Sequence, residues 1–223
     1  MKLEELVRPE AAALVIVDMQ NDFCHPDGAQ AAIGTDVHMV GEMTPRLLAF
    51  LDHARTAGLR TIFVRTEHSP WTNSEVWEAR GSGRHLRSEV RLCLPGTWGA
   101  DFYGGLEPRE SDDWRPAHHD YVVTKHRYSA FIDTDLDLVL RVQQIRTLLM
   151  AGTASNGCVE ATAYMGFMRD YSIVYLSDCT AASSEQRHAE ALQRVRAWGT
   201  VASSSEVVEA WTSLERSRSA ARY

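Results

Sequence analysis

Three reactive side chains close apolar runs that lie far apart in the sequence. Asp18 follows ALVIV, Lys125 ends YVVTK, and Cys158 follows LLM in the turn GTASNGC. A cysteine at neutral pH is mostly thiol, whereas the nucleophile is the thiolate, so another group must accept the proton. A carboxylate can take that proton and return it to a leaving amine, and a nearby ammonium favours the thiolate. Together, these side chains predict acyl transfer by a cysteine nucleophile.

The turn before Cys158 can supply the remaining part of such a site. Residues 153–157 (TASNG) are small and lie between a predicted strand and a predicted helix. Such a turn exposes backbone N–H groups toward a developing oxyanion, and the helix start adds partial positive charge. The spacing of Gly152 and Gly157 resembles a phosphate-binding loop. However, Cys158 and Val159 stand where that loop needs Lys and Ser or Thr, which argues against nucleotide binding.

Each reactive residue also has a simpler interpretation when it is taken alone. Asp18 could cap the following turn, and Lys125 could be a solvated amine. The four cysteines are scattered without a CxxC pair, which predicts free thiols, most of them inert packing residues. A redox sensor in which Cys179 resolves an oxidised Cys158 is a further alternative. The chemical interpretation therefore depends on the three residues meeting at one place.

Size and charge limit the classes of protein to consider. The chain has 223 residues, which fits a single domain spanning 1–223. Its net charge of -7 argues against a surface that binds nucleic acid or anionic lipid, and favours a small-molecule substrate. No apolar run is long enough to span a membrane, and the charged start MKLEELVRPE does not resemble a signal peptide. We therefore expect a cytoplasmic protein.

Strand and helix signals alternate along the chain and indicate how the reactive residues are positioned. Strands are predicted at 13–17, 61–64, 121–123, 148–150, 173–176 and, more weakly, 200–201. Helices are predicted from Thr44–Pro45 to Gly58, and over 134–143, 158–170, 184–198 and 205–216. This alternation predicts a three-layer α/β/α fold with a mostly parallel sheet of about six strands. Ligands of such sheets bind at the carboxyl ends of the strands, where all three reactive residues fall.

The segment 65–120 interrupts this alternation. It is rich in Gly, Pro, Trp, Arg and Ser, and irregular stretches of this length are usually functional. We expect it to form walls of the active site or contacts between subunits.

The sequence around the three residues resembles the isochorismatase-like cysteine hydrolases. The resemblance is carried by IVDMQNDFC, by VVTKHRYSAFIDTDLDLVLR, and by LLMAGTASNGCVEATAYMGFMRDYSIVYLSDCTAA, with their order and spacing kept. It implies a Rossmann-like fold, a catalytic triad of Asp18, Lys125 and Cys158, and an oxyanion hole formed by the backbone of Ala154 and Cys158. It also implies a cis peptide bond at Ala154–Ser155, no required cofactor, and a homodimer or homotetramer.

Within this family, KHRYSAF resembles the corresponding block of the ureidoacrylate amidohydrolase-like branch, as do HSPW and PGTWG. Members of that branch cleave ureido or carbamoyl groups and release ammonia or carbamate. This chain reads ASNGC where they usually read ATNVC, so Gly157 could widen the pocket. Around the triad, Phe23, Trp71 and Tyr128 are candidate aromatic walls, and Arg127 is a candidate clamp for a substrate carboxylate.

Other functions remain as alternatives. True isochorismatases hydrolyse a vinyl ether without a cysteine nucleophile, which Cys158 argues against. Nicotinamidases of the same superfamily hold a metal with an Asp-x-His motif, whereas this chain offers Glu67–His68 and a distant His85, so we expect no metal. A binding protein with an inactive site would lack a member of the triad, and none is missing.

Overall fold

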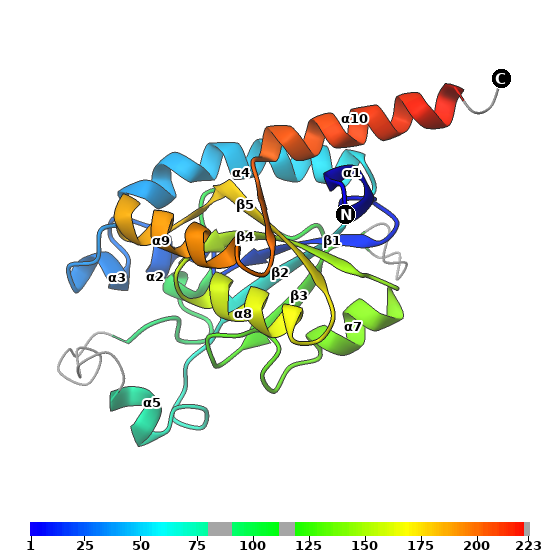
Figure 1. Cartoon of the computed structure of the whole chain (residues 1–223). Helices are drawn as coiled ribbons and strands as arrows, with labels where there is room; N and C mark the ends of the chain where they lie inside the picture. The colour runs from blue at the N-terminus through cyan, green and yellow to red at the C-terminus, as the bar shows by residue number, and fades with distance from the viewer. Residues whose placement is uncertain (80–90, 112–118, 221–223) are drawn as a thin grey trace.

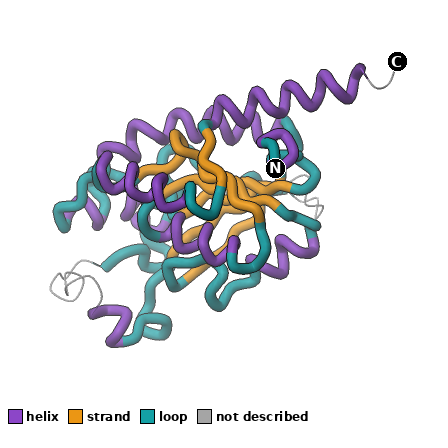
Figure 2. The backbone as a smooth tube through the Cα atoms, in the orientation of Figure 1, coloured by secondary structure: helices purple, strands orange, loops and turns teal. Residues whose placement is uncertain are grey.

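A single parallel sheet runs through the centre of the molecule, with helices on both faces (Figures 1 and 2). The structure is a computed structural model that describes residues 1–79, 91–111 and 119–220. The strand order is β3-β2-β1-β4-β5-β6. The predicted three-layer α/β/α fold is thus confirmed, and each of the six predicted strands is present.

The strands are β1 (Ala12–Val17), β2 (Arg60–Thr66), β3 (Tyr121–Lys125), β4 (Thr147–Thr153), β5 (Ser172–Ala181) and β6 (Thr200–Ala202). The helices are α1 (Leu3–Leu6), α2 (Asn21–Cys24), α3 (Ala29–Ala32), α4 (His38–Thr56), α5 (Glu75–Ala79), η1 (Trp98–Ala100), α7 (Leu136–Val142), α8 (Cys158–Phe167), α9 (Glu185–Val195) and α10 (Ser204–Ala220).

Strand β1 is buried along its whole length because both faces of the sheet are covered. Successive side chains of a strand point to opposite faces. Leu14 and Ile16 therefore join one hydrophobic core, and Val15 and Val17 join the other. This arrangement explains why the predicted strand reads as an uninterrupted apolar run instead of an alternating one.

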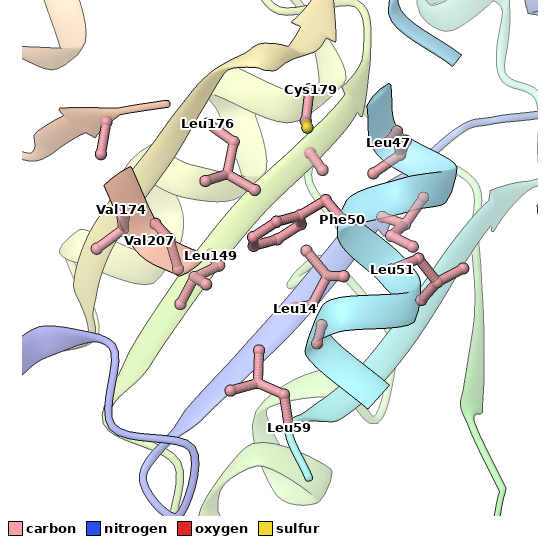
Figure 3. Packing of buried hydrophobic residues seen from close by; sticks show 14 of the residues in the cluster. Leu14, Leu47, Phe50, Leu51, Leu59, Leu149, Val174, Leu176, Cys179 and Val207 are labelled. Carbon is pink, nitrogen blue, oxygen red and sulfur yellow. The ribbon is translucent and has the colours of Figure 1, made fainter. Parts of the chain in front are cut away.

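Helices α4 and α10 cover the first face. Phe50 of α4 points toward the strands that carry Leu14 and Leu149, as Figure 3 shows. Its ring stacks on Trp211 of α10 at a centroid distance of 5.5 Å. The indole nitrogen of Trp211 donates a hydrogen bond to the carbonyl of Val7, which attaches α10 to the N-terminal segment. Helices α7, α8 and α9 contribute apolar side chains to the second core, where they pack against side chains of the strands.

The first residues of α4 differ from the prediction. The sequence predicts a helix start at Thr44–Pro45, but α4 begins at His38 and Pro45 lies inside it. The apolar stripe of the helix includes Val40 and Met43, which precede the proline. Burial of these two side chains extends the helix toward the N-terminus of the chain. The Thr44 hydroxyl instead donates a hydrogen bond to the carbonyl of Val40.

Close contact between β1 and β4 depends on Gly152. Its φ is +106°, and a Cβ at this position would lie 2.1 Å from the carbonyl oxygen of Val17. Only glycine is compatible with this backbone conformation and this approach. The contact brings the turn after β4 next to the residue that follows β1. In the described part of the chain, no helix is both long enough and apolar enough to cross a bilayer.

Candidate active site

Asp18 stands at the carboxyl end of β1. Its backbone N–H donates to the carbonyl of Val64 in β2 at 2.8 Å, and the side chain is buried. Its φ of 54° lies in the left-handed region, which Asp enters more readily than most residues. The chain therefore leaves the sheet at this point and leads into α2.

Lys125 reaches Asp18 from the neighbouring part of the sheet. It lies at the end of β3, paired in register with Thr66 of β2. Its Nζ is 2.8 Å from Oδ2 of Asp18, 2.6 Å from Oγ1 of Thr66 and 3.4 Å from Sγ of Cys158. An ammonium group has three N–H donors, so each of them has an acceptor.

The charge of Lys125 is maintained by its surroundings. Burial acts to lower the pKa of Lys125, but the Asp18 carboxylate and Cys158, through their charges and hydrogen bonds, raise it overall. Lys125 is therefore a cation at neutral pH. Its ammonium group holds the Asp18 carboxylate in place at 2.8 Å.

Cys158 is the first residue of α8 and is partly accessible from a cavity. Burial raises the pKa of its thiol to about 12, and the negative charge of Asp18 acts in the same direction, while Lys125 acts to lower it. The net direction differs from the expectation that the ammonium and the helix start favour the thiolate. The resting group is a thiol, so its proton must move when the substrate is attacked.

The predicted oxyanion donors lie in the turn between β4 and α8. The backbone N–H groups of Ser155, Gly157 and Val159 bond within the protein, to Ala181 and Ala154. Among the described residues, the N–H groups of Ala154 and Cys158 have no such partner, and both residues line the cavity. The cis peptide bond is Thr153–Ala154, one residue earlier than expected.

Ser155 fixes this turn to the body of the protein. Its backbone carbonyl accepts from the Tyr175 hydroxyl, and its Oγ lies 3.0 Å from Nδ1 of His188. Nε2 of His188 lies 3.0 Å from the carbonyl of Ser177 and must carry a proton, because a carbonyl only accepts. Burial lowers the pKa of His188, so its ring is neutral and Nδ1 accepts from Ser155.

A cavity of about 740 Å³ opens above Cys158. Asp18, Phe23 and Tyr128 line it, together with Gln30, Thr35, Asp36, Asn156, Tyr164 and Arg187, among others. Two of the four proposed substrate contacts, Phe23 and Tyr128, are therefore at the cavity.

The structure places the other two proposed contacts elsewhere. Trp71 is 97% exposed and is not part of the cavity wall. Arg127 donates to the carbonyls of Thr72 and His126, and its guanidinium lies 4.9 Å from the centre of the Trp77 ring. In the described chain, the arginine that does line the cavity is Arg187, at the start of α9.

The residues considered as metal ligands do not gather. Glu67 pairs with Arg65, and Nδ1 of His68 lies 3.1 Å from the side-chain oxygen of Asn73. His85 lies outside the described residues. Across residues 1–79, 91–111 and 119–220, no three His, Cys, Asp or Glu side chains are arranged to hold a metal ion.

Two polar residues at the site were not singled out from the sequence. Thr66 contacts both Asp18 and Lys125, and Gln20 binds the backbone of Thr66 through both atoms of its amide group. The signal for Thr66 was available, because the rule that ligands meet at the carboxyl ends of strands applies to β2 as well. The predicted strand ended at residue 64, two residues too early.

Comparison with known proteins gives one consistent family. Residues 12–207 match a family model described as the Isochorismatase domain. The ureidoacrylate amidohydrolase RutB of Methylorubrum extorquens is 33% identical over 185 residues, covering 77% of this chain and 70% of that protein.

Two solved structures share the fold over nearly the whole chain. A cysteine hydrolase from Pseudomonas syringae pv. phaseolicola has a TM-score of 0.76 at 25% identity, covering 92% of this chain and 94% of that one. The N-carbamoylsarcosine amidase of Thermoplasma acidophilum has a TM-score of 0.64 at 28% identity, covering 87% and 96%.

Proposed function

The chain belongs to the isochorismatase family, and on that basis we propose that it is a cysteine-dependent amidohydrolase acting on a ureido, carbamoyl or amide group. Its relatives support a hydrolase of C–N bonds. One observation carries the proposed chemistry: Lys125 Nζ lies within 3.4 Å of both Asp18 and Cys158, next to a cavity that Asp18 and Cys158 line.

The first half of the reaction forms a thioester. Asp18 takes the proton of Cys158 as Sγ attacks the carbonyl carbon of the substrate. The negative charge that develops on the carbonyl oxygen is held by the N–H groups of Ala154 and Cys158. Asp18 then gives its proton to the leaving nitrogen, the C–N bond breaks, and an acyl group remains on Sγ.

The second half returns the enzyme to its starting state. Water gives a proton to Asp18 and attacks the thioester carbonyl, and the C–S bond breaks. Cys158 leaves as thiolate and recovers a proton from Asp18. Lys125 stays charged throughout and holds Asp18 in place. If the acyl group is a carbamoyl group, the product is carbamate, which decays to ammonia and carbon dioxide.

Both the site and the relatives support a small ureido or amide substrate. The cavity volume of about 740 Å³ falls within the range of small-molecule sites. Two relatives are named for ureidoacrylate and N-carbamoylsarcosine, which both contain a carbamoyl nitrogen. Phe23 and Tyr128 are the aromatic residues that we propose contact the substrate.

The proposal is tested by ammonia release from a panel of ureido acids, N-carbamoyl amino acids, biuret, nicotinamide and simple amides. We expect release from at least one ureido or carbamoyl compound, lost in Cys158→Ala and unchanged by a chelator. Mass spectrometry of a rapidly quenched reaction should detect an acyl group on Cys158. Full turnover by Cys158→Ala would disprove the mechanism. Release that a chelator abolishes would favour a metal-assisted amidase of the nicotinamidase type.

A further inference from the structure

The hydroxyl group of Thr66 lies between the two charged members of the triad. Oγ1 is 2.6 Å from Nζ of Lys125 and 2.9 Å from Oδ1 of Asp18. Lys125 can only donate, so Oγ1 accepts its proton, and the Thr66 hydroxyl proton goes to Asp18. Lys125 itself donates to the other oxygen, Oδ2. The direction of each hydrogen bond in this closed set is therefore fixed.

Thr66 is itself held firmly. It is the last residue of β2 and pairs in register with Lys125 of β3. Gln20 accepts from the Thr66 backbone N–H at 2.7 Å and donates to the Thr66 carbonyl at 2.9 Å. A second hydrogen bond from the Gln20 amide goes to the carbonyl of Ala100, and Gln20 is fully buried. The position of the hydroxyl is thus set by the sheet and by a buried amide.

We propose that Thr66 is a positioning residue of the catalytic site, which keeps the Asp18 carboxylate oriented toward Cys158 until the thiol proton is transferred. This inference rests on the proposed cysteine mechanism. Thr66 does not line the cavity formed by the described residues, so it acts through Asp18 and Lys125 and not on the substrate. Loss of the hydroxyl would remove the donor to Oδ1 of Asp18 and allow the carboxylate to rotate away from Cys158.

The test compares Thr66→Val, which removes the hydroxyl and keeps the branched shape, with Thr66→Ser, which keeps the hydroxyl. For Thr66→Val we expect kcat to fall ~10- to 100-fold, the rate equivalent of one hydrogen bond to a charged group, with KM nearly unchanged. Thr66→Ser, which keeps the donor to Asp18, should restore the wild-type kcat.

Thr61→Val is the matched control. Thr61 is on the same strand and buried, and its hydroxyl has no hydrogen-bond partner among the described residues. This variant should keep the wild-type kcat and KM. If Thr66→Val does not fold, Thr66→Ala carries the same test. An unchanged kcat in the hydroxyl-free variant, or failure of Thr66→Ser to restore a lowered kcat, would overturn the proposal.

A second readout needs no substrate. A crystal structure of Thr66→Val should show the Asp18 carboxylate turned away from its position beside Cys158, and a structure of Thr66→Ser should show it in place. If no amide in the panel is hydrolysed but only Thr66→Val displaces the carboxylate, the proposed substrate class fails and the role of Thr66 stands. If an amide is hydrolysed and the carboxylate keeps its position in Thr66→Val, the role of Thr66 fails and the proposed function stands.

Discussion

Lys125 and Asp18 form an ion pair of 2.8 Å with side chains only 1% and 2% exposed. A buried ion pair stabilises a fold little more than apolar residues of similar size would. Loss of one partner, however, leaves a buried charge without compensation and destabilises the fold. The pair therefore couples the stability of the fold to the chemistry of the site.

The first prediction follows from this coupling. Lys125→Met should lower the free energy of unfolding by about 3–5 kcal/mol, because the Asp18 carboxylate loses its cation. The double variant Asp18→Asn/Lys125→Met removes both charges and should recover most of this loss, while activity stays absent. Urea unfolding of the single and double variants measures the coupling. Losses that simply add would contradict a direct interaction between the two side chains.

The second prediction concerns the thiol. The Asp18 charge is the second cause, after burial, that raises the pKa of Cys158 to about 12. Asp18→Asn removes that charge, so the pKa of Cys158 should fall and the thiolate fraction at alkaline pH should rise. Alkylation of Cys158 between about pH 8.5 and 10.5 should become faster, while turnover falls at least ~100-fold because the proton acceptor is lost.

Asp36→Asn is the control for this experiment. Asp36 also lines the cavity, but it is not among the groups that shift the pKa of Cys158. Its removal should leave the alkylation rate unchanged. Slower alkylation in Asp18→Asn would contradict the prediction. It would show that the Asp18 carboxylate favours the thiolate in the resting enzyme, whereas here its charge raises the pKa of Cys158.

The third prediction addresses Gly157, which stands at the cavity wall. A Cβ at this position would lie 3.6 Å from the Cβ and the carbonyl oxygen of Ala154, an ordinary contact distance. Gly157→Ala should remain folded and narrow the cavity beside Cys158. We expect kcat/KM to fall more for bulky substrates than for small ones, measured across a homologous series of acyl groups. An equal fall for every substrate would indicate a disturbed nucleophile turn instead.

The fourth prediction contrasts two glycines. Gly152→Ala places a methyl group 2.1 Å from the Val17 carbonyl at a φ of +106°, so we expect a loss of at least ~3 kcal/mol in the free energy of unfolding. Gly41→Ala lies in α4, where the new methyl group would meet nothing within 4 Å beyond the adjacent backbone of its own helix, and the free energy of unfolding should rise by about 0.5–1 kcal/mol. Thermal and urea unfolding distinguish the two. A tolerated Gly152→Ala would contradict the close approach of β1 and β4.

The sequence was sufficient to predict the sheet because its strands are apolar runs bounded by polar residues, and a parallel sheet buried on both faces requires such runs. It was also sufficient to bring Asp18, Lys125 and Cys158 to one edge, since all three follow such runs. The start of α4 could not be predicted from local signals. Thr44–Pro45 has the pattern of a helix start, and only tertiary burial of Val40 and Met43 overrides it.

Other features of the site depend on distances that a linear sequence does not contain. The pKa of Cys158 is set first by burial, which the neighbouring residues in the sequence do not indicate. Arg127 and Arg187 are both plausible carboxylate ligands by residue type. The contacts of Arg127 with Thr72 and Trp77, and the place of Arg187 on the cavity wall, come only from the fold.

The pairing of Thr66 with Lys125 across β2 and β3 has a consequence for refolding experiments. Asp18, Thr66, Lys125 and Cys158 lie on four segments separated by long stretches of chain, so a collapsed molecule with any of these strands out of register lacks the site. Recovered turnover after dilution from denaturant therefore counts only molecules whose central strands have all aligned. The recovered helical circular-dichroism signal counts all molecules that have regained helices. The difference between this recovery and the recovery of activity would give the fraction of molecules that are compact but have mispaired strands.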